Sequence, residues 1–483
     1  MNNNTLPAIL GGTPERTRPF MVEPMIDENE ERLVLAAIRE KNFSRYIGSH
    51  SPDLETSLRM TSAEAAAIEA DWHFLGGPNV RAFAAEFAAY FDVPFAVPVS
   101  SATTGLSIAL GAAGIAPGDE VILPAISFSA TASAILLFNA IPVFADVDPL
   151  SFCLDPAAVE AAITPATKAI LPVHLLGNLA EMDALLDIAK RHGLMVIEDA
   201  AQAPGAHWRD AKAGTLGNAG VFSFQQSKNI MTGEGGMIVT RDGEIARRAR
   251  LILNHGEVAF DDAASAGDLA NIIGLNARLP ELSAALGRAQ LAKLNLVNEW
   301  RTRNADILRQ ELANLPGLTP APSQRAEGGP AREVPHVFAA LFEATAMGIS
   351  RDRFVAALRA EGVPVGTGYP RTLYENPTFM KQIAYGDAGC PWSSDFYRGS
   401  VAYAPGMCPV AEALLYERFI WFYHIAHAST AEDMRDIGRA VRKTVAARDA
   451  LAGAPEAIFS EYSGHSQGRV GVAQPGAREA RGT

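Results

Sequence analysis

The chain has 483 residues, of which 48% are hydrophobic and 20% are charged, so it can build two or three domains and is not globally disordered. Its 41 basic residues against 54 acidic ones give a net charge of −13, which argues against nucleic acid as a partner because no basic excess neutralises phosphates. Three scattered cysteines are too few for a disulfide framework or a zinc site, so we expect no metal and a reducing cytoplasm.

The first segment, residues 1–78, is expected to combine an extended arm, an amphipathic helix over 28–41 and an irregular insert over 42–72. Its first residues, MNNNTLPAILGG, lack the basic segment and the long apolar run of a signal peptide. The insert begins with loop-forming residues and ends in an Ala/Glu-rich stretch that favours a helix. Two interpretations of the insert stay open: it shapes a substrate pocket, or it only covers the surface.

From residue 79 to residue 300 the sequence predicts a large domain in which helices and strands alternate. The expected strands are 95–99, 120–123, 142–145, 169–173, 195–198, 221–224 and 237–240, and the expected helices are 79–91, 103–114, 130–138, 157–163, 179–192 and 244–254. Such alternation is typical of an α/β fold whose mostly parallel sheet carries helices on both faces. The uncharged stretch 121–145 is long enough to cross a membrane, but prolines and hydroxyl groups interrupt it, so we interpret it as strand, buried helix and strand.

Several chemically useful side chains follow the carboxyl ends of these strands, where ligands bind in parallel sheets. They are the hydroxyl-rich run Ser100–Thr104, Phe128, His174 and Asp199. Most have a plain structural alternative, because hydroxyls cap helices, a phenylalanine packs in a core, and a lone histidine is more often structural than catalytic. Asp199 is the most informative, since a carboxylate at the end of an apolar strand is costly unless a partner compensates its charge.

A single lysine, Lys228, lies between the apolar strands 221–224 and 237–240, and the glycine-rich turn Gly233–Gly236 follows it. Partial burial lowers the pKa of a lysine, and a lysine that has lost its proton is a nucleophile for carbonyl groups. The structural alternative is a lysine that extends from a loop into solvent, as most lysines do. The other residues at this sheet edge favour the functional interpretation.

Together these groups meet the needs of one cofactor, pyridoxal phosphate. Lys228 supplies an amine for a Schiff base with the cofactor aldehyde, and Asp199 supplies an acid partner for the pyridine nitrogen. A helix start with hydroxyl groups binds phosphate, and the expected phosphate ligands are Ala102, Thr103 and Ser223. Phe128 offers a flat apolar face for the ring.

After the large domain, a long helix over 281–300 is expected to link it to a smaller C-terminal α+β domain over 301–446. The expected elements of that domain are a strand at 336–342 and helices at 351–361 and 430–446. Residues 447–483 are expected to form a disordered tail, because the stretch from 464 on is rich in Gly, Arg and Gln and poor in large apolar residues.

Over about residues 7–445 the chain resembles the sugar aminotransferases of the DegT/StrS type, a branch of the fold-type I pyridoxal-phosphate enzymes. The resemblance is carried by Ser101–Thr103, Pro124–Phe128, Pro172–His174, Glu198–Ala203, Phe222–Lys228, Gly233–Gly236 and Gly274–Arg278. It implies a three-layer α/β fold, a proton-shuttling role for Lys228, and contact between Gln202 and the hydroxyl side of the ring. It also implies a homodimer with shared active sites, in which Asn276 reaches the partner's phosphate and Arg278 the partner's substrate pocket. His174 is added to the residues expected on the substrate side.

Three positions depart from the usual family pattern. Ala102 stands where Gly is usual, Pro204 where His is usual, and Gln225–Gln226 where Tyr-Pro is more common. The glutamines resemble the cyclitol and aminohydroxybenzoate branches, which predicts transfer of an amino group from glutamate or glutamine to a keto-cyclitol or nucleotide-linked keto-sugar. The alternatives are a dehydrating or aromatising lyase and a cofactor-binding regulatory protein without turnover; the intact Lys228 and Asp199 disfavour the regulatory protein.

Overall fold

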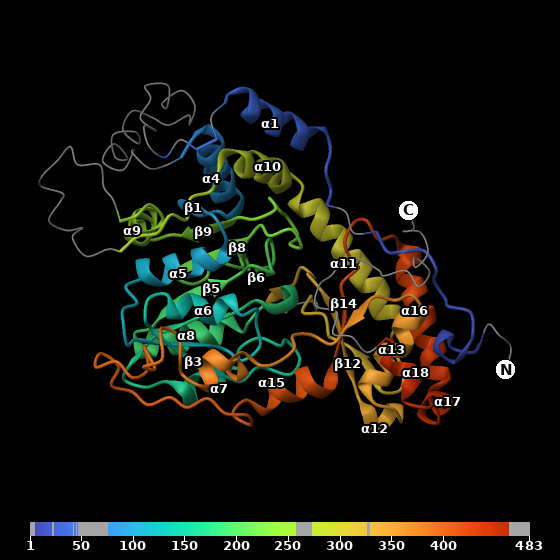
Figure 1. Ribbon diagram of the computed structural model, residues 1–483. Helices are drawn as coiled ribbons and strands as arrows, with labels where there is room; N and C mark the ends of the chain where they lie inside the picture. The colour runs from blue at the N-terminus through green and yellow to red at the C-terminus, as the bar shows by residue number, and fades with distance from the viewer. Residues whose placement is uncertain are drawn as a thin grey trace, which may run out of the picture.

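The computed structural model describes residues 5–21, 24–41, 43–44, 46, 76–256, 273–325 and 329–462. It consists of a large α/β part and a smaller part beside it, joined by a long helical segment that runs between them (Figure 1). Most of the expected insert over 42–72 lies outside the described residues, as do residues 257–272.

The large part is built on a seven-stranded sheet with the order β1-β9-β8-β5-β4-β2-β3. Its strands are β1 (Phe95–Val99), β2 (Glu120–Pro124), β3 (Ile141–Ala145), β4 (Thr167–Ile170), β5 (Met195–Asp199), β8 (Ala219–Ser223) and β9 (Gly236–Thr240). Strand β9 runs antiparallel to its neighbours β1 and β8, whereas the pairs β8–β5, β5–β4, β4–β2 and β2–β3 run parallel. The mostly parallel sheet predicted from the alternating pattern is therefore confirmed.

Two groups of helices flank this sheet, as a three-layer α/β fold requires. In one group α5 packs against α6 and α9, and in the other α7 packs against α8. Their bounds are α4 (Pro78–Phe91), α5 (Ala102–Ala112), α6 (Ala130–Leu136), α7 (Pro156–Ala162), α8 (Met182–His192) and α9 (Gly243–Leu253). The stretch 121–145 forms β2, α6 and β3, as predicted, and within the described residues no helix is long and apolar enough to span a bilayer.

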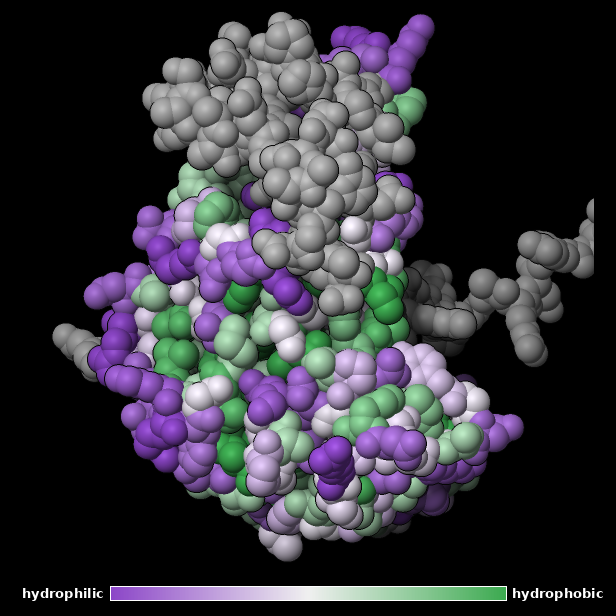
Figure 2. All heavy atoms as spheres, turned by 90° about the vertical axis from the view of Figure 1, so that its left-hand side faces the viewer, coloured by the Kyte–Doolittle hydropathy of each residue, from purple (hydrophilic) through white to green (hydrophobic). Residues whose placement is uncertain are grey.

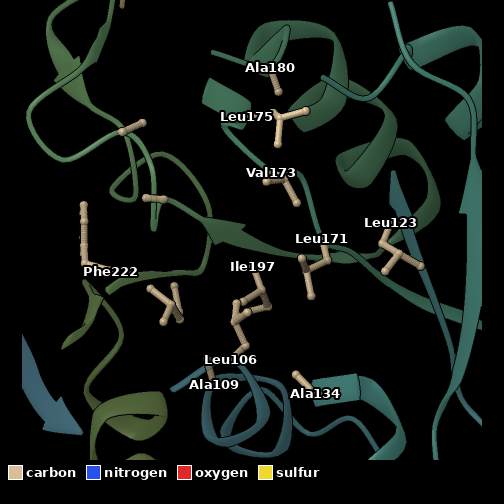
Figure 3. Packing of buried hydrophobic residues seen from close by; sticks show 14 of the residues in the cluster. Leu106, Ala109, Leu123, Ala134, Leu171, Val173, Leu175, Ala180, Ile197 and Phe222 are labelled. Atoms are coloured by element: carbon tan, nitrogen blue, oxygen red, sulfur yellow. The ribbon is translucent and has the colours of Figure 1, made fainter. Parts of the chain in front are cut away.

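Helix α5 lies against the middle of the sheet because it is apolar on nearly every side, so it is buried rather than amphipathic. Figure 3 shows Ile197 of β5 beside Leu106 and Ala109 of this helix, and all three side chains are almost completely buried. Gly105 allows the close approach: a Cβ there would lie 2.8 Å from the Val221 side chain of β8. The helix start, which is the expected phosphate site, is thereby fixed against the sheet.

An aromatic cluster holds β8 in place just before Lys228. Phe83, Phe87 and Phe91 of α4 meet Phe222 and Phe224, with ring centroids 4.4–5.9 Å apart in tilted, edge-on and stacked arrangements. Such contacts add to the free energy gained from burying large apolar rings. The backbone that leads to the lysine loop is therefore rigidly supported.

The linker expected as one helix over 281–300 is two helices, α10 (Glu281–Ala292) and α11 (Leu294–Glu311). They meet at Lys293, whose ammonium group contacts Asp27 at 2.8 Å and Glu30 at 2.6 Å. Asp27 caps helix α1 (Glu28–Arg39) and Glu30 lies in its first turn, so the break in the linker is where the N-terminal helix attaches.

The smaller part has a four-stranded antiparallel sheet with the order β10-β12-β14-β13. Its strands are β10 (Leu318–Pro320), β12 (Phe338–Phe342), β13 (Val365–Gly366) and β14 (Phe419–Phe422), and its principal helices are α13 (Arg351–Ala360) and α16 (Ala431–Ala446). The shorter elements of both parts of the molecule are η1 (Ala8–Leu10), η3 (Leu175–Gly177), α12 (Ala344–Met347), η5 (Leu373–Glu375), α14 (Pro377–Met380), α15 (Pro409–Ala413) and η6 (Leu414–Arg418). A separate small sheet joins β6 (His207–Trp208) and β7 (Ala211–Lys212) to β11 (Ala331–Arg332).

The expected domain over 301–446 is not one unit, because the buried residues between 373 and 415 belong to the core of the large part. Tyr374, Phe379 and Tyr403 pack their rings around Phe144 of β3, with centroids 5.3–5.8 Å apart. The aromatic residues of this stretch show no regular sequence period, and they pack against β3, an edge strand of the large sheet that is distant in sequence.

The expected start of the disordered tail at 447 is wrong. Helices α17 (Arg448–Ala452) and α18 (Ala457–Ser460) continue the smaller part, with Leu451 and Phe459 buried in its core. Residues 463–483, where the composition changes, lie outside the described residues.

The N-terminal arm is fastened to the smaller part by buried charges. Arg16 contacts Asp433 at 2.6 Å and Asp436 at 2.5 Å, and only 3% of its side chain is exposed. Glu361, also buried, accepts hydrogen bonds from the backbone N–H of Ala8 at 2.7 Å and of Glu15 at 2.8 Å. The arm is therefore part of this core rather than a free extension.

Candidate active site

The site lies at the carboxyl edge of the large sheet, where β1, β2, β4, β5 and β8 all end. Lys228 follows β8 in a loop whose backbone is closed by Phe224 N–H to Gly235 O at 2.9 Å and Gln226 N–H to Gly233 O at 2.9 Å. Gly233 has a φ of +83°, a conformation that only glycine adopts without strain. The predicted glycine turn thus sets the direction of the lysine loop.

Lys228 is half-buried, and this burial lowers the pKa of its amine to about 8. The negative charge of Asp199 opposes that shift, whereas the positive charge of Arg301 adds to it. At pH 7 roughly a tenth of the amine is therefore unprotonated, far more than for an ordinary lysine, and the unprotonated amine is the nucleophile for an aldehyde.

Asp199 ends β5, and its carboxylate is buried and held in a fixed orientation. The Thr131 hydroxyl donates to Oδ2 at 2.9 Å, and the Ala201 N–H donates to Oδ1 at 3.2 Å. Burial raises the pKa of this carboxyl, while these hydrogen bonds and the charge of Lys228 counteract the rise. A cationic ring N–H beside Asp199 would supply the compensation that a buried carboxylate needs.

Gln202 connects the ring side of the site to the rest of the molecule. Its Oε1 accepts a hydrogen bond from Leu176 N–H at 2.9 Å, and its Nε2 donates to the Tyr369 hydroxyl at 3.2 Å. Tyr369 in turn packs edge-on against Trp421, with ring centroids 5.2 Å apart. Sequence reasoning missed both Thr131 and Tyr369, because neither lies in a stretch whose pattern places it beside Asp199.

The start of α5 presents the expected phosphate site. Ser101 caps the helix, and its hydroxyl is used by Thr104 N–H at 3.1 Å. The Thr103 hydroxyl forms no hydrogen bond with the described residues, so it is available to a ligand together with the first backbone N–H groups of the helix. A Cβ on Gly236 would come within 2.8 Å of the Ala102 nitrogen, so this glycine leaves the first N–H uncovered. Ser223, the other expected phosphate ligand, is buried at the end of β8, where it pairs with Gly236 of β9.

Phe128, which follows β2, is 60% exposed although it is a large apolar residue. An aromatic ring left open at the edge that carries Asp199 and Lys228 is suited to stack on a flat ligand. The structural alternative, in which Phe128 packs in the core, is therefore wrong.

The expectation that His174 contacts substrate is wrong. Its side chain is completely buried, and its Nδ1 accepts a hydrogen bond from Ala180 N–H at 3.3 Å. The Nε2 therefore carries the proton and donates to Glu198 at 2.9 Å. Glu198 also accepts backbone hydrogen bonds from Gly214, Leu216 and Gly217, so the histidine braces β5 from behind the site.

Asn276 and Arg278 lie beside the end of β1, on a segment whose Ala277 carbonyl accepts a hydrogen bond from Ser100 N–H at 2.7 Å. Asn276 is exposed, and Arg278 donates to the Asn254 side chain at 2.6 Å. Both positions are thus adjacent to the phosphate loop of their own chain. Their predicted reach into a partner's site stays a prediction.

The assembled groups fit pyridoxal phosphate. A half-buried lysine with a lowered pKa, a buried carboxylate that forms no ion pair with the described residues, an open helix start and an exposed aromatic ring lie at one sheet edge. The residues expected to hold the cofactor are thus Lys228 and Asp199, with the supporting set Ala102, Thr103, Phe128, Gln202 and Ser223.

The comparisons with known proteins agree with this geometry. The profile of the DegT/DnrJ/EryC1/StrS aminotransferase family matches residues 55–404. An L-glutamine:2-deoxy-scyllo-inosose aminotransferase from Streptoalloteichus tenebrarius is 37% identical, over 91% of this chain and 97% of the relative. An L-glutamine:scyllo-inosose aminotransferase from Streptomyces griseus is 44% identical, over 62% of this chain and 70% of the relative.

Solved structures give the same picture. The structure of DesI in the presence of its TDP-sugar product is similar with a TM-score of 0.73 and 29% identity, over 93% of this chain and 99% of that one. The structure of 3-amino-5-hydroxybenzoic acid synthase is similar with a TM-score of 0.71 and 29% identity, over 89% of this chain and 100% of that one.

Proposed function

The chain belongs to the DegT/DnrJ/EryC1/StrS aminotransferase family, which uses pyridoxal phosphate, and from this premise we propose that it moves the amino group of glutamine onto a keto-cyclitol. The observation that carries the proposal is the placement of Lys228 and Asp199 at one sheet edge, beside the open start of α5. The relatives named above support the choice of glutamine and of an inosose-type ketone.

Each residue has a task that follows from its surroundings. When bound, pyridoxal phosphate supplies the carbonyl that carries the amino group and the ring that accepts electron density. Asp199 would keep the ring nitrogen protonated, because a buried carboxylate favours a cation beside it. Lys228, whose amine has a pKa lowered to about 8, would take and return a proton at the substrate carbon. Phe128 and Gln202 orient the ring from its face and its edge.

The acceptor class has a second candidate. The likeness to DesI, recorded with its TDP-sugar product, favours a nucleotide-linked keto-sugar instead of a free cyclitol. The likeness to 3-amino-5-hydroxybenzoic acid synthase is the observation that supports the alternative reaction, an aromatising lyase. Glutamine-dependent loss of the visible band of the lysine-bound cofactor separates transfer from that lyase.

We also propose a homodimer with shared active sites in the cytoplasm. Phe128 is 60% exposed, and Ile273, just before Asn276, is 85% exposed. Figure 2 shows the face at the left of Figure 1, where apolar side chains gather across the middle and hydrophilic ones surround them. Exposed apolar groups beside a binding site favour cover by a second chain. The three free cysteines support a reducing compartment.

The first test measures visible absorption. Purified protein with pyridoxal phosphate should show the visible absorption of a lysine-bound cofactor, and Lys228→Ala should lack it. Glutamine alone should then remove the band, and keto-cyclitols should restore it more efficiently than nucleotide-linked keto-sugars. A wild-type protein that never develops the band contradicts the proposal, and a band that no amino donor removes contradicts the transfer reaction.

A further inference from the structure

A buried cation beside Lys228 has no role in the function described so far. Arg301 lies on α11, and only 7% of its surface is exposed. Its Nη1 donates to the backbone carbonyl of His336 at 2.9 Å, and its Nε has no hydrogen-bond partner. Among the described residues no carboxylate forms an ion pair with this guanidinium, whereas most buried arginines need one.

Two hydrogen-bonded routes place Arg301 at the active site. The His336 backbone that receives the arginine donates its own N–H to Leu176 O at 2.8 Å, and Leu176 N–H binds Gln202. The His336 ring reaches Asn229, the residue after Lys228, with 3.3 Å between Nδ1 and Oδ1. One guanidinium is thus connected to both the ring side and the lysine side of the site.

The direction of this network is fixed by one carbonyl. Asn298 donates its Nδ2 to Pro204 O at 2.8 Å, so its Oδ1 must accept from Asn229 Nδ2 at 2.9 Å. Asn229 therefore presents its oxygen to His336, whose Nδ1 must carry the proton. The ring is held neutral, because burial and the charges of Lys228 and Arg301 lower its pKa well below the usual range. The network thus supplies no negative charge to Arg301.

We propose that Arg301 binds the α-carboxylate of the amino donor, a subsite that rests on the aminotransferase function proposed above. The donor amine would take the place of the Lys228 amine on the cofactor, so the donor carboxylate would lie within a few bond lengths of that amine. Arg301 is connected to the neighbouring residue, Asn229, through His336. A carboxylate satisfies the unpaired buried guanidinium through charge-assisted hydrogen bonds. The phosphate of the cofactor has its own site at the start of α5, which leaves the donor as the anion without an assigned partner.

The test is a binding measurement on the cofactor-loaded protein, with ligands that lack the reacting amine. Glutaramate is glutamine with its α-amino group replaced by hydrogen, and glutaramide is the neutral form in which the carboxylate is an amide. Calorimetry should show that the wild type prefers glutaramate over glutaramide. Arg301→Gln should weaken glutaramate binding about 10- to 100-fold and leave glutaramide unchanged, since one charge-assisted interaction is lost.

Two further variants sharpen the result. Arg303→Gln removes an exposed guanidinium on the same helix, which stacks on Trp300 at 3.7 Å, and should leave the preference intact. Arg301→Lys keeps the charge but cannot form two parallel hydrogen bonds with a carboxylate, so it should lose part of the preference for glutaramate over glutaramide. If Arg301→Gln does not fold, Arg301→Lys takes its place in the test. A preference that survives both Arg301 substitutions, or that is abolished by Arg278→Gln instead, overturns the proposal.

The outcome is independent of the test of function. If glutamine never removes the visible band of the wild type, the transfer reaction is wrong whatever the ligands show. If glutamine removes the band and the half-saturating glutamine concentration is the same in wild type and Arg301→Gln, the function stands and the carboxylate subsite is wrong. A wild type that binds glutaramate and glutaramide equally well also rejects the subsite.

Discussion

Lys228 is subject to opposing influences, because burial disfavours its charge while Asp199 favours it. Its pKa falls from 10.5 to about 8, so the folded protein gives up a proton that the unfolded chain keeps between these values. The stability of the cofactor-free protein should therefore rise with pH from about 8 to 10.5 on account of this residue.

A first prediction follows for the cofactor-free protein. Lys228→Met should be more stable than wild type at pH 7 by about 1–3 kcal/mol, and the difference should shrink toward pH 10. Urea unfolding at a series of pH values measures it, with Lys190→Met, an exposed lysine on α8, as the control. A wild type that is the more stable at pH 7 would contradict the burial argument.

A second prediction concerns the hydroxyl that orients Asp199. Thr131→Val keeps the shape of the side chain but removes its hydrogen bond to the carboxylate, so cofactor binding should weaken about 10- to 100-fold. Ser107→Ala removes another buried hydroxyl, bonded to Ala134 O, and should leave the affinity unchanged. Absorbance titration with pyridoxal phosphate compares the two; equal losses would mean that the effect is only one of packing.

At the scale of residues, the sequence predicts the roles of Lys228 and Asp199 because each lies at or just after the end of an apolar strand, which places it at the carboxyl edge of the sheet. Thr131, Tyr369 and Arg301 could not be found in that way, since each comes from a separate element that only the folded chain brings to the site. His174 shows the reverse error: its position after β4 is as expected, but burial on the far side of β5 removes it from substrate.

At the scale of elements, the strands of the large sheet agree with their sequence patterns within a few residues. The strand expected at 169–173 is shifted to Thr167–Ile170, because Pro172 offers no N–H for a ladder. Strand β14 was not predicted, although Phe419–Phe422 is entirely apolar and buried. A run of four residues gives no period from which a strand can be distinguished from a buried helix.

A third prediction belongs to the N-terminal arm. Arg16 and Arg18 both contact Asp433 and Asp436, but 3% of the Arg16 side chain is exposed against 62% for Arg18. Arg16→Met should therefore destabilise the protein by about 3–5 kcal/mol, since two buried carboxylates lose their buried partner. Arg18→Met should cost less than about 1 kcal/mol, as exposed ion pairs do.

Denaturant unfolding followed by tryptophan fluorescence measures both changes. Comparable losses in the two variants would show that the arm is held by its total charge rather than by the buried contact.

At the scale of the whole molecule, the exposed Phe128 and Asn276 predict that the active site is completed by a second chain. The sequence reached this expectation only through the family resemblance, because no periodicity in a single chain encodes a symmetric interface. The same holds for residues 373–415, which return to the large part through aromatic contacts that have no sequence period.

A fourth prediction tests the shared site. Lys228→Ala and Arg278→Ala should each be inactive as purified dimers. Subunit exchange between them should restore about a quarter of the wild-type activity, because half of the dimers are mixed and each mixed dimer holds one intact site. Light scattering should show dimers throughout, and the control is Lys228→Ala mixed with Asp199→Ala. That pair should stay inactive if both residues act within one chain's half of the site.

The buried ion pairs of Arg16 with Asp433 and Asp436 have a consequence for how the protein folds during synthesis. Asp436 is 420 positions further along the chain than Arg16, so the arm leaves the ribosome long before the groups that bury it exist. At about 5–20 residues per second, it waits for roughly 20–80 seconds while the large sheet assembles. The smaller part can close around the arm only after α16 is synthesised, so burial of Arg16 is a late step in the folding of the chain.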